Sequence, residues 1–310
     1  MSTRRPVRRA LSAALLLPAL LAAVSGCGTA APAEGGGPAP LPTKDVVSAA
    51  RKDPKAARLL PASVREKGTL RLASSVGSPP SSAYLDDGRT VVGQDIDFAD
   101  AAARVLGLKL QREEAGFEAI LPALGSGKYD LGTGNFGVTD DRRRSIDFVT
   151  YINDGQGFAV REDSALKKVT SLTQLCGKTV ATGAGTTFEK TLEDHRAECA
   201  KAGKKPYSVK TYAETSAPWA ALQQGRADVV MSTINGVRYA VKQQQGLRFL
   251  NEYKRLDVGF ALKKHSPLAP ALQAAVERLK KDGTYDRILE KWGTTPSAID
   301  RSRISPPEKK

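Results

Sequence analysis

Two short segments of the 310-residue sequence carry residue types suited to binding an anion. In residues 138–142 (VTDDR), Arg142 follows one helical turn after Thr139, whose side chain can cap the start of a helix. Capped backbone amides beside a guanidinium group favour a negatively charged ligand. This segment therefore predicts an anion-binding corner around Arg142.

The second segment, residues 183–187 (GAGTT), lies between an expected strand and an expected helix. Its glycines let the backbone approach a ligand closely, and the hydroxyl and amide groups of Thr186 and Thr187 again favour a negative group. Either segment could also be an ordinary capped loop. Because both follow strands, and open α/β sheets bind ligands beyond the carboxyl ends of their strands, together they predict a shared crevice.

Alternating strands and helices must position these segments. The first half of the chain follows the order β-α-β-α-β, at residues 69–74, 93–108, 109–112, 117–127 and 129–133. The pattern then restarts, with strands at 157–161, 179–183, 208–212, 228–232 and 257–264 and with helices at 187–202, 219–224, 268–281 and near 285–292. A further helix is expected at 45–60, before Pro61. This order predicts an α/β fold of two lobes, each a mostly parallel sheet flanked by helices.

The N-terminus has the features of an export signal. Four arginines within residues 4–9 precede an uncharged apolar run at 10–24. A helix of that length is shorter than a hydrocarbon core of about 30 Å. Because residues 24–27 (VSGC) resemble a bacterial lipobox, we expect residues 1–26 to be a lipoprotein signal peptide and Cys27 to be lipidated; a plain secreted protein is the alternative. Residues 27–43, rich in Gly and Pro after the cysteine, predict a flexible tether.

The chain is basic, with 47 lysine and arginine residues against 33 aspartate and glutamate residues. Such an excess ordinarily suggests a nucleic-acid partner. A protein anchored outside the cytoplasm does not meet nucleic acid there, so we expect no nucleic-acid binding. Anionic lipid or wall polymer, or no partner at all, are the alternatives for the basic surface.

Cys176 and Cys199 are expected to form a disulfide, as paired cysteines of exported proteins usually do. The chain has only two histidines, His195 and His265, so we expect no metal site. Residues 132–137 (GTGNFG) match the dinucleotide pattern G-x-G-x-x-G, but no βαβ unit with an acidic residue about twenty positions on accompanies them. We therefore expect no cofactor.

Three ordered stretches resemble family 3 of the bacterial extracellular solute-binding proteins, the polar-amino-acid-binding components of ABC importers. They are residues 91–110, 116–148 and 279–293. The resemblance implies a type II periplasmic-binding-protein fold, in which two lobes joined by two strands close over a ligand. Transferred to this chain, lobe 1 is 44–150 and 259–310, lobe 2 is 156–253, and the hinges are 151–155 and 254–258.

The resemblance also implies site residues. Arg142 matches the arginine that grips the ligand's α-carboxylate, and Thr187 matches a lobe 2 residue that helps to hold the same group; Thr186 accompanies it in the turn. Phe117 matches an aromatic residue that packs on the ligand, with a place in the core of its helix as the alternative. Asn135 matches a position that offers backbone groups to the ligand.

Four positions depart from the family's pattern. Thr233 stands where the family commonly has the carboxylate that binds the ligand's ammonium group, and Gly77 replaces an aspartate near the prolines at 79–80. Ser81 replaces an aromatic residue, and Gly137 replaces a hydroxyl residue. An ammonium group buried without a counter-charge is costly, so these changes argue against an ordinary α-amino acid as the ligand.

We therefore expect a monomeric lipoprotein, anchored to the outer face of the cell membrane, that captures a small carboxylate-bearing solute and delivers it to an ABC permease. The solute is expected to be an amino acid or a derivative. A sensory or wall-binding lipoprotein of the same fold is an alternative. Some relatives of the family are dehydratases acting on cyclic carboxylic acids, but the usual carboxylate positions of the cleft hold no acid here, so we expect no enzyme.

Overall fold

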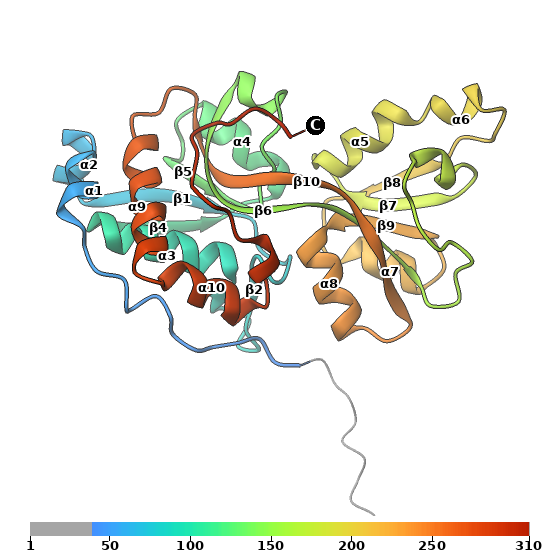
Figure 1. Ribbon diagram of the computed structural model, residues 1–310, viewed down its shortest axis with the longest axis horizontal. Coiled ribbons are helices and arrows are strands. Elements are labelled where there is room, and N and C mark those ends of the chain that lie inside the picture. Colours follow the sequence, from blue (N-terminus) through green and yellow to red (C-terminus); the bar gives the residue numbers. More distant parts are fainter. Residues whose placement is uncertain (1–38, 310) are drawn as a thin grey trace, which may run out of the picture. The chain divides into compact units, whose positions relative to one another are not determined.

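The computed structural model describes residues 39–309 (Figure 1). The expected signal peptide, the expected lipidation site at Cys27 and the expected tether as far as residue 38 lie outside the described residues. Among the helices of residues 39–309, none is both long and apolar enough to span a membrane.

An eight-stranded sheet forms the centre of the described chain, in the order β4-β1-β5-β10-β6-β9-β7-β8. The strands are β1 (Thr69–Ser74), β4 (Lys109–Glu114), β5 (Leu131–Thr133), β6 (Ile146–Arg161), β7 (Thr179–Gly183), β8 (Ser208–Tyr212), β9 (Val229–Thr233) and β10 (Leu247–Lys263). A separate two-stranded hairpin is formed by β2 (Ala83–Tyr84) and β3 (Val91–Val92).

Two groups of parallel strands are joined by two long antiparallel strands. Strands β4, β1 and β5 run parallel to one another, as do β9, β7 and β8. Strands β6 and β10 pair antiparallel and run side by side from one group to the other (Figure 1). We use lobe 1 for the first group with its helices and lobe 2 for the second. The predicted α/β fold with mostly parallel strands is confirmed, and the antiparallel exception is the connecting pair.

The two segments predicted to be hinges, 151–155 and 254–258, lie inside β6 and β10. They face each other in the ladder, where Asp154 pairs with Leu256. Their role as hinges, and the lobe boundaries that depend on it, stay a prediction.

Helices cover both faces of the sheet. In lobe 1 they are α1 (Pro54–Arg58), α2 (Ala62–Lys67), α3 (Gln94–Leu106), α4 (Phe117–Gly125), α9 (Ala269–Lys281) and α10 (Thr284–Trp292). In lobe 2 they are α5 (Thr187–His195), α6 (Glu198–Lys201), α7 (Ala217–Gln223) and α8 (Ile234–Gln243). Short 3-10 turns are η1 (Arg142–Arg144), η2 (Leu172–Leu175) and η3 (Thr295–Ser297).

Helix α3 forms much of the core of lobe 1. Gly107 ends it in the left-handed conformation, with φ 70°, which a residue without a Cβ adopts easily. The buried ring of Phe98 packs against Tyr151 of β6 and Tyr285 of α10, with ring centroids 5.1 and 5.3 Å apart. These contacts fix α3 and α10 to a connecting strand of the sheet.

The helix predicted at 45–60 is wrong in its first half. The carboxylate of Asp45 accepts hydrogen bonds from the amides of Val47 and Ser48 in a turn, and the helix begins only at Pro54. Proline has no amide proton and is suited to the first position of a helix, so Pro54 favours a helix that starts there over one that continues from residue 45. The segment nevertheless packs on lobe 1, because Val46 belongs to the same buried cluster as helix α3.

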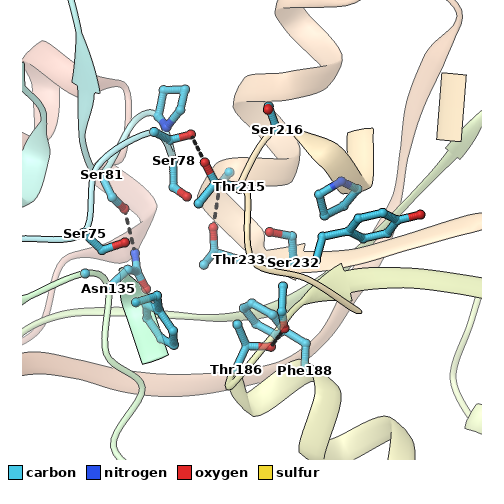
Figure 2. A pocket seen from close by; sticks show the side chains of 18 of the residues that line it. Ser75, Ser78, Ser81, Asn135, Thr186, Phe188, Thr215, Ser216, Ser232 and Thr233 are labelled. Carbon is cyan, nitrogen blue, oxygen red and sulfur yellow. Dashed lines mark hydrogen bonds between the residues drawn. The ribbon is translucent and has the colours of Figure 1, made fainter. Parts of the chain in front are cut away.

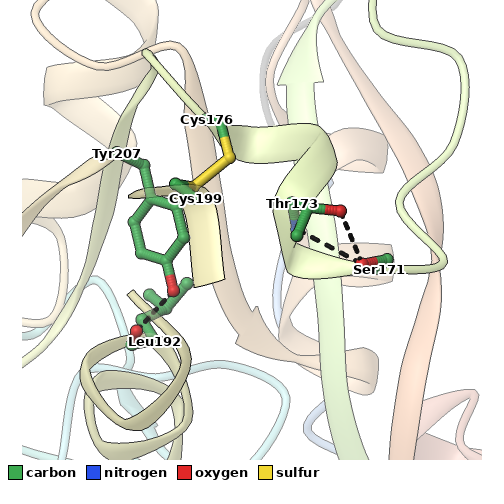
Figure 3. Close-up of a disulfide and its surroundings, with 6 residues drawn as sticks. All are labelled: Ser171, Thr173, Cys176, Leu192, Cys199 and Tyr207. Atoms are coloured by element: carbon green, nitrogen blue, oxygen red, sulfur yellow. Dashed lines mark hydrogen bonds between the residues drawn. A yellow bond between two sulfur atoms is a disulfide. The ribbon is translucent and has the colours of Figure 1, made fainter. Parts of the chain in front are cut away.

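Lobe 2 contains the expected disulfide between Cys176 and Cys199 (Figure 3). It joins the end of η2 to α6, beside Tyr207, whose hydroxyl donates to the carbonyl of Leu192. The single helix expected at 187–202 is wrong, because the chain turns after His195 and forms the separate helix α6. Cys199 is completely buried there, so the disulfide forms part of the core of lobe 2.

Candidate functional site: a cavity between the two lobes

A cavity of about 260 Å³ is lined by residues of both lobes (Figure 2). All six residues predicted to bind a ligand lie in its wall, namely Phe117, Asn135, Arg142, Thr186, Thr187 and Thr233. The labelled side chains in Figure 2 come from both lobes and surround one common space. The two anion-binding segments therefore meet at one cavity, and their contact with a ligand stays a prediction.

Arg142 is the first residue of η1, and hydrogen bonds of its backbone and side chain hold it in place. The hydroxyl of Thr139 accepts a hydrogen bond from the amide of Arg142 at 3.2 Å, although the turn is a short 3-10 element rather than the helix expected. The guanidinium group donates to the carbonyl of Gly137 in lobe 1 and to that of Gly185 in lobe 2, each at 3.1 Å. Arg142 thus bridges the two predicted anion-binding segments directly.

The positive charge of Arg142 has no carboxylate partner within residues 39–309. Burial lowers the pKa of its guanidinium to about 10, because the surrounding protein removes water from the charged form. That pKa still leaves the group protonated at neutral pH. A half-buried cation with unused N–H groups and no anion beside it is suited to receive a carboxylate.

On the lobe 2 side, the turn at 183–187 is closed by Thr186. Its hydroxyl donates to the carbonyl of Gly183 at 2.7 Å and accepts from the amide of Glu189 at 3.2 Å, which caps α5. The carbonyl of Thr187 accepts from the side-chain amide of Gln156 at 3.2 Å. The hydroxyl of Thr187 has no hydrogen bond in the described part of the chain and remains available at the first residue of α5.

Aromatic rings form the apolar part of the wall. Phe117 stacks on Phe136, with centroids 4.9 Å apart, and the guanidinium of Arg142 lies 5.7 Å from the centroid of Phe117. Phe117 thus packs on a core ring and also lines the cavity, and its contact with a ligand stays a prediction. Lobe 2 contributes further rings to the wall, from Phe188, Tyr212, Trp219 and Tyr239.

The predicted contact between backbone groups of Asn135 and a ligand stays a prediction, and one of those groups is already engaged within the protein. The backbone amide of Asn135 donates to the carboxylate of Asp95 at 2.7 Å and is not free for a ligand. Its side-chain amide donates to Ser81 and to Asp154, each at 3.0 Å. The residue adopts the left-handed conformation, with φ 52°, which asparagine tolerates better than most residues. Its side-chain carbonyl has no partner among the described residues.

Two buried carboxylates lie behind Asn135. Burial raises the pKa of Asp95 to about 7 and that of Asp154 to about 6, because the charged forms are removed from water. Asp154 also accepts from the backbone amide of Asn235 at 3.1 Å. Neither carboxylate belongs to the wall of the cavity.

The wall of the cavity contains one charged residue, Arg142, and no acidic residue. Gly77 and Thr233, where the family commonly has acids, both line the cavity. Gly77 has φ 103°, and a Cβ added there would lie 2.6 Å from the hydroxyl oxygen of Thr215. An aspartate at position 77 would therefore clash with Thr215 and strain the backbone.

Sequence reasoning missed the loop between β8 and α7. Thr215 of this loop donates a hydrogen bond to the carbonyl of Gly77 at 2.8 Å, which is a second direct contact between the lobes. Ser216 and Pro218 also line the cavity. No motif marks these residues, because they reach the cavity only through the arrangement of the lobes.

In the described part of the chain, no group of three or more histidine, cysteine, aspartate or glutamate side chains could hold a metal ion. The wall of the cavity offers hydroxyl groups, aromatic rings and one guanidinium group. This set can bind an anion with an uncharged body.

Residues 70–295 match the family model of bacterial extracellular solute-binding proteins, family 3. The arginine-binding protein ArgT of Corynebacterium glutamicum is 28% identical over 255 residues, which cover 81% of this chain and 83% of that protein. An ancestral arginine-binding protein bound to arginine has a TM-score of 0.66 and 34% identity, covering 73% of this chain and 98% of the other.

A third relative is an ancestral amino acid-binding protein described as a precursor of cyclohexadienyl dehydratase. It has a TM-score of 0.66 and 29% identity, and covers 74% of this chain and 97% of its own. The family model spans more than half of the chain, and these relatives share its fold and most of its length. The chain belongs to family 3 of the bacterial extracellular solute-binding proteins.

Proposed function

We propose that this protein is the substrate-binding component of an ABC importer and captures a small carboxylate-bearing solute in the cavity between its lobes. The observation that carries the proposal is the guanidinium of Arg142, which lines a cavity between the lobes and has no carboxylate partner within residues 39–309. The relatives named above bind amino acids, and a carboxylate is the group that their ligands share with the proposed solute.

Closure of the lobes would complete the site. Arg142 belongs to lobe 1 and Thr187 to lobe 2, so one carboxylate can contact both only when the lobes are close together. A ligand that makes contacts available only in the closed form shifts the population toward that form. The hydrogen bonds from Arg142 to Gly185 and from Thr215 to Gly77 support this proposal, because they already join the lobes at the cavity.

We propose binding rather than catalysis. The wall of the cavity contains no aspartate, glutamate, histidine, lysine or cysteine, the side chains that most often act as acid or base. We further propose that Cys27 anchors a monomeric protein on the outer face of the membrane, where it would meet its permease. The sequence of the N-terminus supports this location.

The proposal is tested by a thermal-shift screen followed by calorimetry. Amino acids, N-modified amino acids and small dicarboxylates serve as probes, since a ligand at one hundred times its Kd adds about 2.7 kcal/mol of stability. For the best ligand, Arg142→Ala should weaken binding by about 2 to 5 kcal/mol, as the loss of a charged partner of a buried ion does.

Arg144→Ala is the matched control, because Arg144 lies in the same 3-10 turn but is exposed and pairs with Asp141. Its affinity should stay within about twofold of the unmodified protein, as is usual for exposed pairs. An unchanged affinity in Arg142→Ala would remove Arg142 from the site and the proposal with it.

A further inference from the structure

We infer that the solute bound in this cavity carries a carboxylate but no cationic group, so that an α-amino acid with a free ammonium group is a poor ligand. This inference rests on the proposed function, which supplies the carboxylate. It adds that the rest of the molecule is uncharged and largely apolar or aromatic, as in a 2-hydroxy acid or an N-acylated amino acid.

The charges of the wall give the first argument. Arg142 can balance one carboxylate, and the wall has no acidic residue to balance a cation. Moving an ammonium or guanidinium group out of water without a counter-charge costs several kcal/mol. A zwitterionic ligand would leave its positive end without a partner, whereas a hydroxyl or an amide group needs only a hydrogen bond.

The carboxylates beside the cavity give the second argument, because none of them belongs to its wall. Asp95 accepts a hydrogen bond from the backbone amide of Asn135, and Asp154 accepts one from the side-chain amide of the same residue. Glu189 accepts the amide of Gly185 at 2.7 Å. Glu118, which lies against Gly185, and Glu214 are both exposed, and neither lines the cavity.

The two positions of the wall where the family commonly has an acid, 77 and 233, both hold neutral residues here. Only position 233 could accept an acid without strain. At position 77, the backbone conformation and the hydroxyl of Thr215 strongly disfavour an aspartate side chain. At position 233, the hydroxyl of Thr233 accepts the amide of Gly236 at 2.9 Å and so caps α8. Aspartate and asparagine are equally good caps, so this position could carry a charge without loss of the helix.

Hydroxyl groups and rings occupy the space instead. The hydroxyl of Ser81 accepts from Asn135, which leaves its own proton free to donate toward the cavity. The side-chain carbonyl of Asn135 is free to accept a proton from a hydroxyl or amide group. Together with the rings of Phe117, Phe188 and Trp219, these groups match an uncharged body rather than a cationic one.

The test compares matched ligand pairs by calorimetry on the full protein at pH 7. Phenyllactate and N-acetylphenylalanine are compared with phenylalanine, and 2-hydroxyisocaproate is compared with leucine. The member of each pair that lacks an ammonium group should bind at least roughly tenfold more tightly, since a missing partner for a buried charge costs at least one hydrogen bond to a charged group. Equal or tighter binding of the amino acids would overturn the inference while leaving the proposed function intact.

Two substitutions at one position make the test specific. Thr233→Asp should tighten binding of phenylalanine roughly tenfold or more and weaken that of phenyllactate, because the new carboxylate pairs with an ammonium. Thr233→Asn keeps the cap without the charge and should leave the preference unchanged. If Thr233→Asp brings no gain for the amino acid, the missing acid does not set the preference. If no carboxylate of either class binds, the proposed function fails as well.

Discussion

At the scale of single residues, Asn135 links two buried carboxylates, Asp95 of lobe 1 and Asp154 of a connecting strand, by donating a hydrogen bond to each. Asp95 lies in the first turn of α3 and Asp154 lies in β6, and both side chains are completely or almost completely buried. One oxygen of Asp95 has no hydrogen-bond partner within residues 39–309. Burial raises the pKa of Asp95 to about 7, because the charged form is removed from water, although hydrogen bonds to the carboxylate lower the pKa in part.

Stability should therefore depend on pH through Asp95. Because the pKa of Asp95 is about 7 in the fold and near 3.8 when exposed, the folded state binds the proton more tightly. Below pH 4, Asp95 is protonated in both states and does not destabilise the fold. The free energy of unfolding then falls as the pH rises toward 7, and the loss reaches its full size above pH 7. Asp95→Asn should raise the free energy of unfolding at pH 8 by on the order of 1 to 3 kcal/mol, and by much less at pH 4.

Urea denaturation at pH 4, 6 and 8 checks this prediction. Asp86→Asn, the same substitution at an exposed position, provides the control. A loss of stability at pH 8 in Asp95→Asn would mean that the charged carboxylate, rather than the protonated one, is the form the fold prefers.

The residues of the site divide by whether a local pattern marks them. Arg142, Thr186 and Thr187 were predictable because each lies in a segment of five consecutive residues, 138–142 or 183–187, whose residue types indicate a turn and a helix cap. Thr215 was not, because its hydrogen bond to Gly77 spans 138 positions in the sequence. The engagement of the Asn135 amide by Asp95 was also hidden, since it joins residues 40 positions apart.

At the scale of elements, local chemistry accounts for most of the regular structure and long-range pairing for the rest. Helix α3 ends at the expected glycine, and β1 spans 69–74 as predicted. Only 157–161 of the sixteen-residue strand β6 was recognised, because its middle contains Asn153, Asp154 and Gly155, which are poor strand formers. Pairing with β10 overrides that preference. Helix α8 was missed because β9 leads into it at Thr233 without a break.

The disulfide should stabilise lobe 2 substantially. It closes a loop with a sequence separation of 23 residues, for which the chain-entropy model gives about 3 kcal/mol. The double variant Cys176→Ala/Cys199→Ala should lose at least that much free energy of unfolding in urea denaturation. Reduction of the unmodified protein isolates the effect of the crosslink from that of the lost side chains. A reduced protein as stable as the oxidised one would contradict the prediction, because the crosslink would then not stabilise the fold by lowering the entropy of the unfolded chain.

At the scale of the whole described chain, the important fact is that the site belongs to neither lobe. Lobe 1 supplies the guanidinium of Arg142 and the ring of Phe117, and lobe 2 supplies the capped turn at 183–187 and most of the other rings. Strands β6 and β10 are the covalent connections between them in the sheet. Binding and movement of the lobes are therefore coupled in this account, because a ligand held by both sides stabilises one arrangement of the two strands.

The most direct measurement is a crystal structure of the protein with the tightest ligand of the calorimetric series. The account predicts that the ligand's carboxylate oxygens lie about 3 Å from the guanidinium of Arg142 and from the hydroxyl or amide of Thr187, so that both lobes hold the same group. It also predicts hydroxyl groups and aromatic rings, with no acidic side chain, around the remainder of the ligand. A ligand bound to one lobe alone, or with its carboxylate turned away from Arg142, would contradict the account.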